Sequence, residues 1–455
     1  MKYNYKNSKF ISFILAIFLV MLSIPLSNIM GFEPLQVKGV CFLFAALILW
    51  ISDAIPMALA TLLLIFLLPL FGLMEYNDVV SSFGVGTSLF IMASSGITVA
   101  IAKSNIPHKI AELVFVKMCK HPIGLIYCFG LCVTIFSGFV SSLATCTLFT
   151  ALAATALNNL KLDKKTSGFA KSLMLTIPAC AGIGGFISPA GTPANILVLD
   201  ILEEKGVEIT FGKWCSIGLP ISLLESFIFL SLLVIILKPE KINVSGALVT
   251  KSFNKNDYIV LSIVLLVILG WLLSGFVPAL NITLIAIIGL IIFFLPSIDI
   301  LSFGEFSSGV NWNLVFTMGS VSVLMIAIAN TGLITNVTTF FTPFLTSTTI
   351  YWLLFGISVL ICFIRAFVPT TTAVIALLVP MLVAISAITS VNYATLLLIA
   401  SFWAATALLL IYTEPIYLIS YKEGYFKQGD LIKVGLPASL IIADICPYLI
   451  YKFLR

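Results

Sequence analysis

Apolar residues fill long runs of this chain, and short clusters of glycine, proline, lysine and hydroxyl residues separate them. A helix needs about 20 residues to cross a bilayer core, so some runs suit full crossings and others suit half-crossings or hairpin arms. The pattern predicts an all-α polytopic membrane protein with about 11 transmembrane helices and additional re-entrant hairpins. The runs are Phe10–Leu26, Val40–Ile51, Ala58–Leu73, Gly124–Val140, Ser172–Ala181, Ile217–Leu237, Tyr258–Leu273, Ile282–Leu295, Leu314–Ala329, Tyr351–Ile364, Ala373–Ile388, Ala394–Ile411 and Leu431–Ile450.

Composition supports the membrane assignment and excludes several kinds of function. Of 455 residues, 60% are hydrophobic and 9% are charged, whereas a soluble domain carries about a quarter charged residues. The nine cysteines show no metal-ligand spacing, and two histidines are too few for a metal cluster. Because the chain has no Walker loop, we expect no nucleotide hydrolysis of its own and no ATPase subunit as partner.

Basic residues gather in two segments between apolar runs. Lysine-rich short loops stay in the cytoplasm. We therefore expect the protein in the cell membrane of a prokaryote, with the N-terminus and residues 161–171 on the cytoplasmic side. Residues 1–30 then form a first transmembrane helix, with a cleaved signal peptide as the alternative. The net charge of +5 is spread over such loops and does not indicate nucleic acid. The two groups are Lys2, Lys6 and Lys9, and Lys161, Lys164, Lys165 and Lys171.

Five motifs of the first half recur in the same order in the second half. This order predicts two repeats, residues 38–237 and 258–455, joined by a hydrophilic linker at 238–257. Inverted repeats are typical of secondary transporters, which bind their substrate where the repeats meet. The alternative is that apolar helices resemble one another by chance. The matched motifs begin at Trp50 and Trp271, Gly84 and Gly309, Phe139 and Phe367, Gly191 and Tyr412, and Phe211 and Phe426.

Each repeat contains a segment that should interrupt a membrane helix. The first is GIGGFISPAGTPANILV from Gly182, which predicts a broken helix near 168–200. Its counterpart near 393–420 breaks at YTEP, residues 412–415. Broken helices are tolerated where they line a cavity, and their free backbone groups can bind ions. The hydroxyls of Ser188 and Thr192 and the amide of Asn195 add neutral donors and acceptors. A kink with packing roles alone is the plainer alternative.

The motifs ALILWISDAIPMALATLLL, GFISPAGTPANILV and YFKQGDLIKVGLP resemble those of the divalent anion/sodium symporter family within the ion transporter superfamily. The resemblance covers nearly the whole chain from Trp50. It implies a scaffold domain, which is often dimeric, and a transport domain that moves as an elevator. It also implies that each repeat carries a re-entrant hairpin, here near 123–160 and 345–390. By the same resemblance, hairpin tip and helix break together are expected to hold sodium ions and the substrate's carboxylates.

The resemblance also predicts which residues form the tips of the two hairpins. Ser141 matches the serine of the family's Ser-Asn-Thr motif, while Ser142 and Leu143 replace its asparagine and threonine. The second tip is a threonine run whose register is open by one residue. The implied sodium ligands are Ser137, Ser141, Ser142 and the carbonyl of Gly191 in the first repeat, and Thr370 and Thr371 in the second. The implied substrate ligands are Ser142, Thr192, Pro193, Asn195, Thr371, Thr372, Thr413 and Arg365.

Charged residues inside apolar runs call for separate hypotheses. Arg365 precedes the second tip, and Glu414 stands at the second break. Buried ionisable groups are costly and face a partner or a cavity. Glu414 can pair with Arg365, hold a cation, or bind a proton and couple transport to it. The alternative is that Arg365 reaches the membrane interface and Glu414 lies in water. Four further carboxylates are expected at span ends: Asp53, Asp200, Glu225 and Asp444.

Together these features predict a secondary transporter of small dianions, C4-dicarboxylates such as succinate first, coupled to sodium. Sodium-independent exchange, proton-linked transport and sulfate or citrate as substrate remain alternatives. A channel is disfavoured because two inequivalent hairpins lie in one chain. No catalytic motif indicates an enzyme. The expected partners are the anion, the bilayer and a second copy of the chain in a homodimer.

Overall fold

The computed structural model is helical, and within the part of the chain it describes there is no strand, which confirms the all-α prediction. Among the described residues, six helices are long and apolar enough to cross a bilayer, or up to eight if each of two bent pairs forms one span. The other apolar helices have 10–17 residues, so the figure of about 11 crossings stays a prediction. The described residues are 2–29, 33–52, 54–114, 121–164, 166–242, 252–277, 280–332, 349–368 and 371–455.

The described helices after the first form two series in the same order. The first series ends in a hairpin, a helix broken in two, and a long helix, and the second series ends in the same way. The N-terminal helix is α1 (Lys2–Ile29). The first series is α2 (Pro34–Ser52), α3 (Met57–Leu67), η1 (Pro69–Phe71), α4 (Tyr76–Ser81), α5 (Val85–Lys103), α6 (Ile106–Glu112), α7 (Pro122–Ser137), α8 (Ser142–Asn159), α9 (Gly168–Gly184), α10 (Pro193–Glu204) and α11 (Phe211–Leu237).

The second series repeats this sequence of long and short helices. Polar caps begin several of them: Asn254 and Asp257 form a capping box at α12, and Asn281 accepts a hydrogen bond from Thr283 at α13. The second series is α12 (Lys255–Leu273), α13 (Ile282–Ile292), α14 (Phe303–Gly309), α15 (Trp312–Asn330), α17 (Ile350–Phe367), α18 (Thr371–Ile388), α19 (Tyr393–Ala405), η3 (Ile411–Thr413), α20 (Pro415–Tyr421) and α21 (Gln428–Leu454).

Matching helices of the two series exchange their packing partners. Helix α3 packs against α15, and α13 packs in the same way against α5. Helix α10 packs against α18 and α19, and its counterpart α20 packs against α8 and α9. Such reciprocal contacts are what two copies related by a two-fold axis produce.

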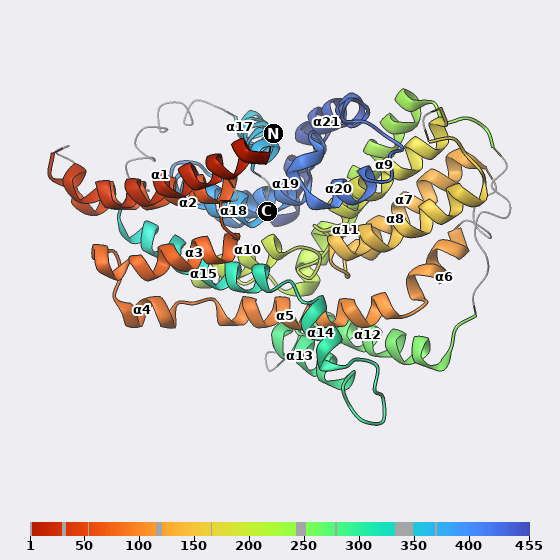
Figure 1. Ribbon diagram of the computed structural model, residues 1–455, viewed down its shortest axis with the longest axis horizontal. Helices are drawn as coiled ribbons and strands as arrows, with labels where there is room; N and C mark the ends of the chain where they lie inside the picture. Colours follow the sequence, from red (N-terminus) through yellow and green to blue (C-terminus); the bar gives the residue numbers. More distant parts are fainter. Residues whose placement is uncertain are drawn as a thin grey trace.

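The helices gather in two groups (Figure 1). Helices α1–α5 lie with α12–α15, and α7–α11 lie with α17–α21. The groups meet where α10 and α18 touch α15, with further contacts of α10 to α5 and of α11 to α12. The broken helices and hairpins belong to the second group and face the first across this boundary.

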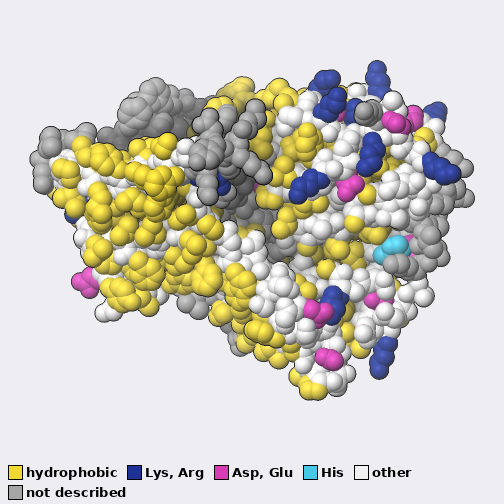
Figure 2. All heavy atoms as spheres, viewed as in Figure 1, with side chains coloured by type: hydrophobic (Ala, Val, Ile, Leu, Met, Phe, Trp, Pro, Cys, Tyr) yellow, Lys and Arg dark blue, Asp and Glu magenta, His cyan; other side chains and the backbone are white. Residues whose placement is uncertain are grey.

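Large apolar side chains cover the outside of the first group (Figure 2). On α1, Phe10 and Phe18 are more than half exposed, and Leu266 on α12 is 64% exposed. Lipid tails are as apolar as these side chains, so such a surface fits a protein surrounded by a bilayer. Lysine, arginine and carboxylate side chains gather instead toward the other end of this view.

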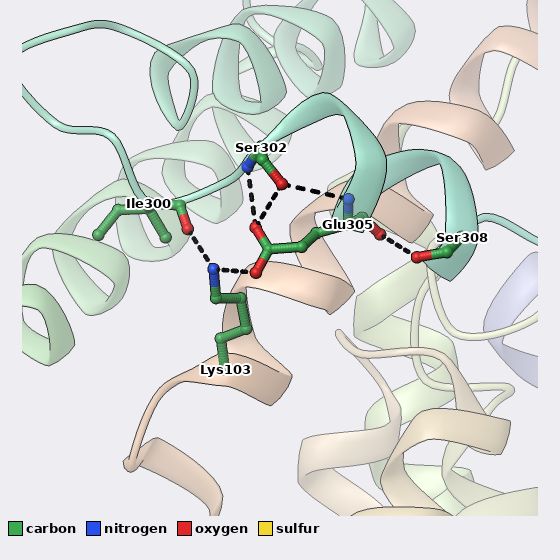
Figure 3. Close-up of polar contacts among 5 residues, drawn as sticks. All are labelled: Lys103, Ile300, Ser302, Glu305 and Ser308. Carbon is green, nitrogen blue, oxygen red and sulfur yellow. Dashed lines mark hydrogen bonds and ion pairs between the residues drawn. The ribbon is translucent and has the colours of Figure 1, made fainter.

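A polar contact joins the two series within the first group (Figure 3). At the end of α5, Lys103 donates to the carbonyl of Ile300 at 2.8 Å and to Glu305 Oε1 at 2.6 Å. Glu305 also accepts from the backbone N–H and hydroxyl of Ser302, both at 2.9 Å, and so caps α14. Because the ion pair is about half exposed, its contribution to stability is small, and its effect is to hold α14 against α5.

Candidate functional site

The first broken helix ends at Gly184 and resumes at Pro193. Side chains satisfy the carbonyls that the break leaves free, as buried backbone groups require. Asn195 Nδ2 donates to the carbonyls of Gly185 and Ser188 at 2.7 Å each. From α11, Trp214 Nε1 donates to Phe186 O at 2.9 Å, and Ser222 Oγ donates to Ile183 O at 3.1 Å. The irregular segment is therefore held rigidly by α10 and α11.

The second broken helix ends at Ala405 and resumes at Pro415 after the short η3 turn. Gln428, the first residue of α21, donates to Leu409 O and accepts from the N–H of Ile411, both at 2.8 Å. Thr406 donates to Glu225 Oε1 on α11 at 2.8 Å. Both breaks are thus fixed by the last helix of a series.

One cavity of about 230 Å³ is lined by residues at the starts of four helices. That volume equals roughly seven to eight water molecules at about 30 Å³ each, which suits a small solute. Helix N-termini present free N–H groups and a positive dipole end. The lining residues at these starts are Ser141 and Ser142 of α8, Thr192 and Pro193 of α10, Thr371 and Thr372 of α18, and Glu414 and Pro415 of α20. Among the lining residues, Glu414 is the one charged side chain.

A cluster of neutral oxygens borders the cavity at the first break. Ser142 Oγ donates to the carbonyl of Gly191 at 3.4 Å and lies 3.1 Å from Ser137 Oγ. Ser137 Oγ in turn donates to Ala181 O at 2.6 Å. Hydroxyl and carbonyl oxygens of this kind are ligands for a small hard cation. A cation there would replace the hydrogen bonds that these oxygens now make to one another.

The second break carries an ion pair at the corresponding place. The guanidinium of Arg365 is buried, and it contacts the carboxylate of Glu414, which is 15% exposed. Arg365 Nε donates to Ala404 O at 2.9 Å and Nη1 to Val368 O at 2.8 Å. Of the three hypotheses for Glu414, the structure therefore shows the pairing with Arg365.

Most of the predicted site residues line the cavity, and three lie behind its wall. Ser137 and Asn195 are fully buried and, like Arg365, do not line the cavity. The carboxamide of Asn195 is used within the protein, since Oδ1 also accepts from Ser401 Oγ at 2.5 Å. Thr370 and the side chain of Thr413 lie outside the described part of the chain.

Several cavity residues from the first group of helices were not predicted. Asn311, Asn313 and Thr317 line the cavity at the start of α15, and Met57 lines it at the start of α3. Asn313 Oδ1 accepts the N–H of Ala58 at 2.9 Å and so ties α3 to α15. The signal was present in the motif GVNWN, where two amides interrupt an apolar region.

The expectation that Glu225 is interfacial is wrong. Helix α11 spans Phe211–Leu237, so Glu225, the fifteenth of its 27 residues, lies near the middle of the helix and not at its end. Its side chain is fully buried and holds Thr406 beside the second break. Of the other three carboxylates, Asp444 is exposed, Asp200 is half-buried, and Asp53 lies outside the described residues.

Comparison with known proteins places this architecture among transporters. An uncharacterized transporter of Haemophilus influenzae is 24% identical over 450 residues, 95% of each chain. The inorganic phosphate transporter PHO87 of Saccharomyces cerevisiae is 23% identical over 73% of this chain and 36% of its own length. The sodium-dependent dicarboxylate transporter SdcS of Staphylococcus aureus is 27% identical over 43% of this chain and 40% of its own. The chain thus spans nearly all of the first relative but under half of each of these two.

Two solved structures share the fold. The YdaH transporter of Alcanivorax borkumensis superimposes with a TM-score of 0.60 at 13% identity, covering 97% of this chain and 98% of its own. MtrF of Neisseria gonorrhoeae superimposes with a TM-score of 0.62 at 11% identity, covering 96% and 94%. A family model described as the sodium:sulfate symporter transmembrane region matches residues 6–453. The chain therefore belongs to the sodium:sulfate symporter family of membrane transport proteins.

Proposed function

We propose that this protein is a secondary carrier of small dianions, with C4-dicarboxylates as the first candidate substrates and sodium as the coupling ion. The observation that carries the proposal is the single cavity lined by four helix N-termini and hydroxyl groups. Converging N-termini attract an anion without a lysine or arginine in the wall. Glu414 does not oppose this, because Arg365 balances its charge.

Sodium is assigned to the neutral oxygen cluster at the first break. The hydroxyls of Ser137 and Ser142 and the carbonyl of Gly191 offer oxygen ligands without a competing charge. Ser141 and Thr371, at the starts of α8 and α18, are nearby candidates on the cavity wall. A cation there would add a positive charge beside the bound anion, which makes the binding of each favour the other.

The arrangement of helices supports alternating access by movement of one group against the other. The cavity lies where the group of α7–α11 and α17–α21 meets α3 and α15. Inverted repeats with such a boundary let a site face either side in turn. We propose that the group with the hairpins moves as an elevator and that the other group is the scaffold, dimeric in the membrane.

Exchange of one anion for another without sodium is the second candidate function. In the second repeat a cationic side chain, Arg365, already stands at the place that corresponds to the oxygen cluster of the first break, so no coupling ion is needed there. Uptake into proteoliposomes separates the two: succinate, malate, fumarate, citrate, sulfate and phosphate are offered with sodium or potassium outside. We expect uptake of a dicarboxylate that sodium stimulates and Ser142→Ala reduces. Failure of every anion to enter, with or without internal anion, would reject the proposal.

Proton coupling through Glu414 is tested separately. If the carboxylate stays paired with Arg365 during transport, wild-type uptake should not require its protonation. Uptake by Glu414→Gln is compared with the wild type across pH, with protein level in the membrane as the control. A variant that transports well but has lost a pH dependence present in the wild type would favour proton-linked transport instead.

A further inference from the structure

The two hairpins carry chemically different side chains at one buried position near the end of their first helix. Ser137 and Arg365 each stand two residues before a Phe-Val pair at the hairpin tip, and each is buried. Ser137 Oγ donates to Ala181 O near the end of α9, at 2.6 Å. Arg365 Nε donates to Ala404 O near the end of α19, at 2.9 Å. The two side chains therefore occupy equivalent places, one with a hydroxyl and the other with a cation.

The surroundings of these two places also correspond. The guanidinium contacts three segments: Ala404 O before the break, Val368 O at the hairpin tip, and Glu414 at the start of α20. In the first series the same three segments meet around neutral oxygens, with Gly191 O at the start of α10. The oxygens that would surround an ion in the first series thus surround a guanidinium in the second.

We propose that Arg365 is the resident cation of the second repeat and that the carrier has one exchangeable cation site, at Ser137, Ser142 and Gly191. The inference rests on the proposed sodium-coupled function. A guanidinium stays charged in proteins, and it faces the carbonyls at the negative end of α19. Glu414 is its counter-ion and keeps the buried pair neutral overall. The second break then keeps its cation whether or not sodium is present, whereas the first break binds an exchangeable one.

The experiment measures how uptake depends on sodium concentration in the wild type and in Arg365→Ser/Glu414→Thr. The double variant gives the second repeat the residues found at Ser137 and Thr192. We expect a Hill coefficient for sodium of about 1 in the wild type and one clearly above 1 in the variant, because a coefficient above 1 requires more than one site. A wild-type Hill coefficient for sodium clearly above 1 would overturn the inference. A variant that transports with unchanged sodium dependence would overturn it too.

Sodium-dependent thermal stabilisation of the purified protein decides the question if the double variant does not fold. Sodium should raise the unfolding temperature of the wild type relative to potassium, and Ser142→Ala should abolish the whole effect. A sodium effect that persists in Ser142→Ala means a second site and overturns the inference, and so does the absence of any effect in the wild type. Sodium stabilisation without uptake of any anion would reject the proposed transport function but retain the single cation site.

Discussion

At the scale of single residues, the first break depends on glycine at a point of close approach. A Cβ on Gly191 would lie 2.4 Å from the carbonyl oxygen of Gly185, a distance that side chains do not tolerate. The carbonyl of Gly191 is also the backbone member of the proposed cation site. Glycine is therefore required at this position for two reasons: a side chain has no room, and the carbonyl must stay where Ser142 contacts it.

We expect Gly191→Val to abolish uptake while leaving the protein in the membrane. The valine would push the two turns of the break apart and displace the carbonyl from Ser142. Gly304→Val is the matched control, because a Cβ there meets nothing within 4 Å. Sodium-dependent uptake normalised to protein level measures the difference, and a well-expressed Gly191→Val protein with normal uptake would contradict the site.

Single residues also show what sequence reasoning could reach. Thr192 was predictable because it lies between glycine and proline within an apolar region, whereas Ser141 and Ser142 followed from the resemblance of the hairpin tip to the family's motif. Asn311 and Asn313 carry an equally polar signal, but their place opposite the hairpins is decided by the packing of α15 on α3. Such long-range contacts leave no local pattern in one sequence.

At the scale of elements, the last helix of each series positions the break of its own series. Gly218 on α11 approaches the carbonyls of Phe186 and Ile187, and Gly435 on α21 approaches that of Leu408. Both glycines stand in a Gly-Leu-Pro motif. The likeness of FGKWCSIGLP and FKQGDLIKVGLP thus has a packing cause, which was not evident from the sequence alone.

Gly435→Ala should damage this contact, since a Cβ would lie 1.7 Å from Leu408 O. Overpacking of this kind costs about 1–3 kcal/mol, and moving the unwound segment should also impair uptake. Gly429→Ala on the same helix is the control, because its Cβ meets nothing within 4 Å. Thermal unfolding in detergent and uptake are compared. Equal behaviour of the two variants would show that α21 does not position the second break.

Helix α9 depends on a carboxylate from the segment after α11. Glu240 accepts from the hydroxyl of Ser167 and from the N–H of Phe169, the latter at 2.8 Å. Partial burial raises the pKa of the Glu240 carboxyl, but these hydrogen bonds outweigh it and hold the pKa below its usual value. The negative charge at the N-terminus of α9 also matches the helix dipole.

Because the pKa is lower in the folded state, this carboxylate stabilises the protein above the unfolded-state pKa, about 4.3. The contribution is lost as pH falls through the folded-state value. We therefore expect Glu240→Gln to lower the unfolding temperature near neutral pH and to converge with the wild type in acid. Thermal unfolding of both proteins over a pH series measures this. A difference that stays constant into acid would mean that the charge of Glu240 plays no part.

At the scale of the whole molecule, the reciprocal contacts of the two series are the feature that most constrains the mechanism. The packing of α3 on α15 and of α13 on α5 fits a two-fold relation. The order of motifs allowed the duplication to be predicted from the sequence. The boundary between the two groups of helices could not be predicted, because every helix is apolar and any pair could pack.

Inverted repeats require matching loops on opposite sides of the membrane. The test introduces one cysteine at a time into a cysteine-free protein. Lys164→Cys lies between α8 and α9, and Ser390→Cys lies between α18 and α19. A membrane-impermeant thiol reagent added to whole cells should label Ser390→Cys and spare Lys164→Cys until the cells are opened. Labelling of both residues from the same side would show parallel repeats and reject the inversion.

The most direct test of the shared binding cavity is protection by substrate. Thr192→Cys and Thr371→Cys place thiols on two helix starts from different series that line the cavity. With sodium present, succinate should slow their modification by a thiol reagent several-fold and leave the control Ser390→Cys unaffected. Protection of one position without the other, or of neither by any anion that the protein transports, would contradict a single site built from both halves.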